Sequence, residues 1–194
     1  MQKALLVFAV LFSFSCNNPE PKVTDVAAPV VFTGTSGNSA AFNASFKKAL
    51  QAYYALKDQF VEEQLAGIDT AASQLMNSVN NIMIDSLSGD STILMVARTY
   101  TSGINAELIG LKGESDLEEK RKAFQMVGEQ FYDLIRTVQY DQEVIYHLYC
   151  STVFDNEGAS WLSPSVQISN PYLSKTKPAC GEVRDSIDLR IKKK

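Results

Sequence analysis

Apolar side chains recur at intervals of three and four residues between Phe42 and Val138, which is the spacing of one buried face of an α-helix. Four such stripes can be traced. Their members are Phe42, Phe46, Leu50, Tyr53, Leu56 and Phe60; Leu65, Ile68, Ala72, Leu75, Val79 and Ile82; Ile93, Ala97, Tyr100, Ile104, Leu108 and Leu111; and Leu117, Phe124, Val127, Phe131, Leu134 and Val138. Antiparallel helices joined by short turns bury such stripes economically. The pattern therefore predicts an all-α fold, an antiparallel four-helix bundle.

Short polar stretches interrupt the stripes. The first helix is expected to end near Glu63, and Gly67 lies close to the junction with the second stripe, so either a short turn or one long bent helix is open there. The stretch DSLSGDS breaks the pattern after the second stripe. It offers Asp90 or Ser91 as the N-cap of the third helix, because short polar side chains accept hydrogen bonds from the first turn.

The pattern changes near residue 143. From Val144 to Cys150 most side chains are β-branched, aromatic or apolar, which is typical of a buried strand. From Asp155 to Pro178 the chain is rich in Gly, Ser, Asn and Pro, so this stretch is expected to be mostly loop, with one short extended piece at VQIS. We therefore expect a loop-rich C-terminal segment, at about residues 143–185, that contains one or two short strands.

The first residues have the layout of a secretory signal peptide. Lys3 precedes the apolar run ALLVFAVLF, which is too short to span a bilayer, and small residues follow. Their position before Cys16 resembles a bacterial lipobox, so residues 1–15 are expected to be removed and Cys16 to be lipidated. A plain signal peptide cleaved near Ser15, with Cys16 free, is the alternative. The expectation is an exported protein of the periplasm or cell envelope, held to a membrane by its N-terminal lipid.

Residues 16–38 are expected to be a flexible tether, because they hold three of the six prolines and show no helical period. The folded domain would then cover residues 39–194. The formal net charge of −4 argues against a nucleic-acid partner. The sequence holds one histidine, and neither a Ser-His-Asp arrangement nor a phosphate-binding glycine loop is visible. We therefore expect that the protein is not an enzyme.

Four blocks in the C-terminal segment carry a resemblance to a known family. They are Cys150, then GASWLS from Gly158, then ISNPY from Ile168, then CGEV from Cys180. Together with YYALKDQFVEEQLAGIDTAASQL and RKAF in the helical part, they resemble a bacterial periplasmic domain of unknown function. That domain occurs alone in lipoproteins and at the C-terminus of copper and silver efflux adaptor subunits. The resemblance implies handling of a soft ion such as Cu(I) or Ag(I), which sulfur ligands select, and an efflux-system component as a partner.

The resemblance assigns the two cysteines as metal ligands. The family places Pro and Met after the first cysteine and another Met before the second, whereas here Ser and Thr follow Cys150 and Lys177 stands before Cys180. Linear Cu(I) needs two soft ligands, which Cys150 and Cys180 can supply, and His147 is a candidate third ligand. On a strand, the spacing of His147 and Cys150 would place their side chains on opposite faces.

A structural disulfide is the other interpretation of the cysteine pair. An exported protein meets oxidising conditions, in which Cys150 and Cys180 would tend to pair. Closing that loop would contribute about 3.5 kcal/mol in the chain-entropy description. Two functions therefore stay open from the sequence: a membrane-anchored protein that binds or handles soft metal ions, and a structural or protein-interaction lipoprotein with a degenerate metal site and a Cys150–Cys180 disulfide.

Other residues of the resembling blocks are expected to shape the C-terminal segment. They are Gly158, Trp161, Asn170, Pro171, Tyr172 and Gly181. Trp161 is interpreted as a core plug whose indole N–H needs one partner. The Asn-Pro-Tyr stretch is interpreted as a turn with an aromatic anchor. The two glycines are expected where the backbone adopts conformations that other residues resist.

Overall fold

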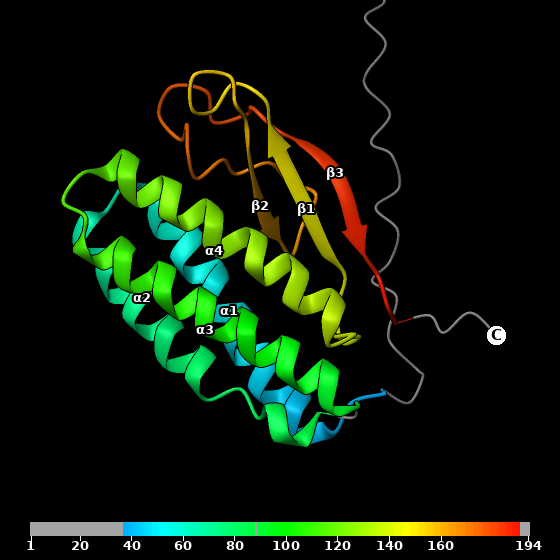
Figure 1. Ribbon diagram of the computed structural model, residues 1–194. Helices are drawn as coiled ribbons and strands as arrows, with labels where there is room; N and C mark the ends of the chain where they lie inside the picture. The colour runs from blue at the N-terminus through cyan, green and yellow to red at the C-terminus, as the bar shows by residue number, and fades with distance from the viewer. Residues whose placement is uncertain (1–36, 88, 191–194) are drawn as a thin grey trace, which may run out of the picture. The chain divides into compact units, whose positions relative to one another are not determined.

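The computed structural model describes residues 37–87 and 89–190 (Figure 1). The expected signal peptide, the lipid on Cys16 and most of the tether lie outside the described residues. The helices are α1 (Ala40–Glu62), α2 (Leu65–Asn80), α3 (Ser91–Gly113) and α4 (Leu117–Thr137), with a short 3₁₀ helix, η1 (Ile84–Ser86), between α2 and α3. Three strands follow, β1 (Ile145–Cys150), β2 (Ala159–Ser163) and β3 (Glu182–Ile187).

The helix ends follow local backbone chemistry. Ser39 caps α1 and Asp90 caps α3, because each side chain accepts a hydrogen bond from a backbone N–H group of the first turn. After α1, Glu63 adopts the left-handed conformation with φ 57°, and its N–H bonds back to the last turn. The first two stripes therefore belong to separate helices, and the break lies at Glu63 and Gln64 rather than at Gly67.

The predicted apolar stripes form most of the core. All six side chains of the first stripe are fully buried. Phe124 of α4 lies between two aromatic residues of α1, with its ring centroid 5.3 Å from that of Tyr53 and 4.7 Å from that of Phe60. Leu65 departs from the prediction and is 45% exposed, because it stands at the first position of α2. The described chain is thus mostly helical, and its helices form a bundle with an aromatic centre.

The C-terminal segment, where one or two short strands are expected, has three, and they form an antiparallel sheet in the order β2-β1-β3. β1 lies where a strand is expected, but VQIS forms no strand, and ASWLS in β2 and EVRDSI in β3 do. β2 is buried along its whole length. Its sequence therefore lacks the alternation of polar and apolar residues that marks a half-buried strand. β3 is an edge strand whose first five residues are exposed.

The sheet lies beside α4, with β3 on its outer edge (Figure 1). One hydrogen bond joins the sheet to the centre of the bundle: the backbone N–H of Leu162 in β2 donates to Tyr53 Oη of α1 at 3.1 Å. Tyr53 is fully buried, and burial raises the pKa of its hydroxyl group. The sheet and the helices therefore share one core, and β2 lies in the middle of it.

Candidate functional site

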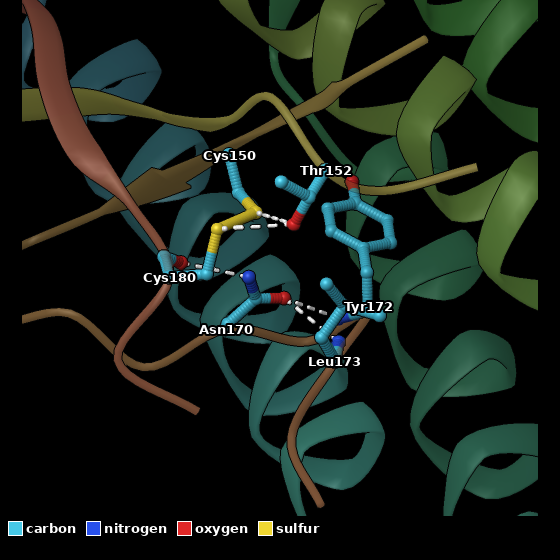
Figure 2. The surroundings of a disulfide bond; sticks show 6 residues. All are labelled: Cys150, Thr152, Asn170, Tyr172, Leu173 and Cys180. Atoms are coloured by element: carbon cyan, nitrogen blue, oxygen red, sulfur yellow. Dashed lines mark hydrogen bonds between the residues drawn. A yellow bond between two sulfur atoms is a disulfide. The ribbon is translucent and has the colours of Figure 1, made fainter. Parts of the chain in front are cut away.

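Cys150 and Cys180 form a disulfide bond with an S–S distance of 2.07 Å. Cys150 ends the central strand β1 and is buried, whereas Cys180 lies in the connection between β2 and β3 and is partly exposed. Figure 2 shows the Thr152 side chain beside the bond, with Oγ1 3.5 Å from each sulfur. The sequence leaves open whether this pair binds a metal ion or forms a disulfide, and in the structure the two cysteines form a disulfide. The bond ties the long β2–β3 connection to the end of β1.

The buried side chain of Asn170 fixes the β2–β3 connection through hydrogen bonds to its backbone. Its carboxamide Nδ2 donates to the carbonyl oxygen of Cys180 at 2.8 Å, and its Oδ1 accepts from the backbone N–H groups of Tyr172 and Leu173 at 2.8 and 2.9 Å (Figure 2). An Asn side chain that accepts from the N–H two residues later makes an Asx turn. Asn170 makes such a turn where the sequence predicts one, and the turn is hydrogen-bonded to the backbone of Cys180, next to the disulfide.

Tyr172 and Trp161 are the aromatic residues that seat the connection on the sheet. Both are 1% exposed, and their ring centroids lie 6.1 Å apart. Tyr172 Oη donates to the carbonyl oxygen of Ser160 in β2 at 2.6 Å, and its ring also approaches Phe124 of α4. The expected aromatic anchor and core plug are thus in place. The indole Nε1–H of Trp161 finds no acceptor among the described residues.

Gly158 and Gly181 are each needed at their position, but for different physical reasons. Gly158 has φ +84°, a conformation that side chains resist, and an added Cβ would lie 2.1 Å from Tyr149 Oη. At Gly181 the reason is space, because an added Cβ would lie 2.9 Å from the Trp161 ring and 3.0 Å from Ile168. Gly181 therefore lets the backbone next to Cys180 pass close over Trp161.

A buried arginine anchors the connection to the helices. Arg121 of α4 is 8% exposed; its Nε donates to the carbonyl oxygen of Pro171 at 3.2 Å, and its Nη2 to Glu63 Oε1 at 2.9 Å. Ser174 Oγ donates to the same Glu63 oxygen at 2.7 Å. Partial burial opposes ionisation of Glu63, but the hydrogen bonds from Ser174 and Arg121 outweigh it and lower the pKa of that carboxyl group.

Sequence reasoning missed this anchor and identified Glu63 only as the expected end of the first helix. One signal was available: Arg121 lies four residues after Leu117 and three before Phe124, so it stands on the buried stripe of its own helix. A charged side chain on such a stripe needs buried partners, because an unpaired charge in the core is costly. Its position therefore pointed to an acceptor in another part of the chain.

His147 lies apart from the disulfide. It stacks on Tyr132 of α4, with ring centroids 4.4 Å apart, and it pairs across the sheet with Asp185 of β3. Because β1 is a strand, His147 and Cys150 project to opposite faces, and His147 does not join the cysteines. Burial, followed by the nearby Arg184 guanidinium, lowers the pKa of His147. The structure thus brings Cys150 and Cys180 together and places the candidate third ligand elsewhere.

The disulfide holds the C-terminal segment in one conformation, and because both sulfurs are in the bond, neither cysteine provides a thiolate. Within residues 37–87 and 89–190, no group of three or more His, Cys, Asp or Glu side chains is placed to hold a metal ion. The chemical change that this arrangement allows is reduction of the bond, which would release two thiols whose Cα atoms lie 5.6 Å apart in the oxidised form. Without reduction, the C-terminal segment is a closed loop with buried aromatic anchors.

A comparison with known protein families found a match in the helical part of the chain. Residues 49–143 match a family described as "Protein of unknown function (DUF3347)". The match begins in α1 and stops just before β1, so it does not include the disulfide or Trp161. No match was found among curated proteins or solved structures. None of the described helices is long and apolar enough to cross a membrane. The chain is therefore similar, across most of its helical bundle, to a domain family of unknown function.

Proposed function

We propose that the protein is an exported, lipid-anchored binding protein, not an enzyme, whose C-terminal segment is a protein-interaction element closed by the Cys150–Cys180 disulfide. The observation that carries the proposal is the disulfide itself, together with the Asn170 and Arg121 hydrogen bonds that fix the same loop. Disulfides persist in oxidising compartments, in agreement with the signal-like first residues. A loop held in one conformation loses little conformational entropy when it binds a partner.

The lipid anchor makes a direct prediction about the mature N-terminus. We expect the chain isolated from its membrane to begin at Cys16 and to carry acyl groups there, and mass spectrometry of the N-terminal peptide measures this. Cys16→Ser should move the protein from the membrane fraction to the soluble fraction, because lipid would be the main contact with the bilayer. An unmodified N-terminus near Cys16, with no change of fraction in the variant, would support the plain signal peptide instead.

Soft-metal handling is the second candidate function, and one feature of the site favours it. Cys180 is partly exposed, so a reductant or a metal donor can approach the sulfur pair. The reduced thiols lie close enough for both to bind one linear Cu(I) or Ag(I) ion. In that case the protein would exchange the ion with a component of a cation-efflux system, as the resemblance of its sequence implies.

An anaerobic Cu(I) titration against a weak competing chelator separates the two candidates. Under the proposed function, neither the oxidised nor the fully reduced protein takes Cu(I) from the chelator, because the thioether ligands of the resembling family are missing. Tight one-to-one binding by the reduced protein, lost in both Cys150→Ser and Cys180→Ser, would replace the proposal with metal handling. His147→Gln is the matched control, and it should change nothing because His147 lies on the opposite face of β1.

A further inference from the structure

The two sulfurs of the disulfide differ in their access to solvent. Cys150 is 1% exposed and ends the central strand β1, whereas Cys180 is partly exposed. Residues 175–179, directly before Cys180, are all exposed, and so is Ser151 next to Cys150. The bond therefore lies close to the surface on its Cys180 side, and a reagent from solvent meets Cys180 Sγ first.

Thr152 offers a hydroxyl group to both sulfurs. Its Oγ1 lies 3.5 Å from Cys150 Sγ and 3.5 Å from Cys180 Sγ (Figure 2). A sulfur in a disulfide carries no hydrogen, so the hydroxyl group is the donor in both contacts. Hydrogen bonds to charged acceptors are stronger than those to neutral ones. The contact therefore gains strength when one of the sulfurs becomes a thiolate.

The backbone at each cysteine is also held by contacts that do not need the bond. Cys150 pairs across the sheet with Ala159 of β2. The carbonyl oxygen of Cys180 accepts from Asn170 Nδ2 at 2.8 Å. When the bond opens, these contacts keep the two sulfurs close together. Two thiols held in this way re-form their disulfide at a high effective concentration.

We propose that the Cys150–Cys180 pair is a thiol–disulfide exchange site, which an external thiolate opens by attack on Cys180 Sγ. An S–S bond forms between the attacking sulfur and Cys180 as the Cys150–Cys180 bond breaks, and the electron pair leaves with Cys150 Sγ. The departing sulfur then takes a proton from water. A second external thiolate attacks the mixed disulfide and frees Cys180, which is protonated in turn. Two external thiols are thereby oxidised to one disulfide, and the protein gains two thiols.

Thr152 has a specific part in this exchange because the departing sulfur is buried. A charge that forms among buried side chains is costly unless a donor compensates it. The Thr152 hydroxyl group already lies within hydrogen-bond distance of Cys150 Sγ, so it stabilises the thiolate as that charge develops. The inference goes beyond the proposed function and does not depend on it, because it concerns the opening of the bond and not what the segment binds.

The rate of reduction by dithiothreitol tests access to the bond. The full chain carries Cys16→Ser, which removes the third cysteine, and free thiols are counted by alkylation and mass spectrometry. We expect a rate proportional to the dithiothreitol concentration and nearly unchanged by urea too dilute to unfold the protein. A rate independent of dithiothreitol, or one that rises steeply with urea, would overturn the proposal, because the bond would then open only in unfolded molecules.

Peptide mapping of the mixed disulfide identifies the sulfur that is attacked. After brief treatment with reduced glutathione and quenching in acid, glutathione should be found on Cys180. Cys150→Ala and Cys180→Ala are the matched pair, each with one thiol left to react with oxidised glutathione. Cys180 should react at least about tenfold faster than Cys150, since access controls thiol reactivity. Glutathione on Cys150 of the wild-type protein, or equal rates in the pair, contradicts attack at Cys180.

Thr152→Val removes the hydroxyl group and keeps nearly the same shape. We expect reduction to be about tenfold slower in this variant, because it loses a hydrogen bond to a developing charge. Thr152→Ser keeps the hydroxyl group and should reduce at close to the wild-type rate. Both oxidised variants should unfold at the urea concentration of the wild type. Reduction of Thr152→Val at the wild-type rate, or of Thr152→Ser as slowly as Thr152→Val, would exclude the role of the hydroxyl group.

Transfer of the reduced protein to oxidised glutathione tests whether the site closes again. The bond should re-form without urea and without a change in circular dichroism, because both cysteines keep their backbone contacts. Accumulation of protein with glutathione on both cysteines would show that the two thiols separate after reduction, and would overturn the exchange site.

Discussion

Reduction of the Cys150–Cys180 disulfide is expected to lower the free energy of unfolding by about 3.5 kcal/mol. The bond joins cysteines that are 30 residues apart, so opening it returns conformational freedom mainly to the unfolded chain. Urea denaturation with and without reductant measures the change. Trp161 is the only tryptophan and lies inside the loop, so its fluorescence reports on the C-terminal segment while circular dichroism reports on the helices.

The matched control is the double variant Cys150→Ala with Cys180→Ala. It should unfold near the urea concentration of the reduced wild-type protein, and the reductant should have no effect on it. Alanine is preferred to serine because Cys150 is 1% exposed, and a buried hydroxyl group would add its own cost. Coincident unfolding curves for the oxidised and the reduced wild-type protein would show that the bond does not hold the segment in place.

Trp161→Ala is expected to cost about 3 to 5 kcal/mol of unfolding free energy. The side chain is 1% exposed, lies in a strand that is buried on both faces, and contacts Tyr172 and the backbone at Gly181. Its loss would leave a cavity between the sheet and the β2–β3 connection. Urea denaturation followed by circular dichroism measures the effect, since the variant has no tryptophan.

Trp161→Phe separates packing from hydrogen bonding at the same position. Because the indole N–H has no acceptor among the described residues, phenylalanine leaves no polar group without its partner. We therefore expect a clearly smaller loss of stability than for alanine. A loss as large as that of Trp161→Ala would mean that the indole N–H makes a bond that stabilises the fold.

Local pattern was sufficient for the helices. The stripe from Phe42 to Phe60 is fully buried, and Asp90 caps α3, because helix period and capping depend on residues that are close in sequence. The end of α1 near Glu63 could also be predicted. The choice between a short turn and one long bent helix at that point could not be predicted, because a left-handed Glu63 has no sequence signal comparable to a glycine.

The strands were harder to predict because their signals depend on what covers them. β2 is buried on both faces, so ASWLS shows no alternation of polar and apolar residues. β3 is an exposed edge strand, and its polar sequence EVRDSI is equally typical of a surface loop. The anchor at Arg121 depends on Pro171 and Glu63, which are 50 and 58 residues away. No short window of the sequence contains both partners.

The sequence by itself determined the helical stripes, the choice of Asp90 or Ser91 for the cap of α3, and the short list of residues that build the C-terminal segment. These depend on side-chain period and on residue types whose chemistry is the same wherever they stand. Only the tertiary structure decided that Cys150 and Cys180 are bonded and that His147 stacks on Tyr132 of α4. Each of these depends on which distant surfaces meet, and that is settled by packing the whole core at once.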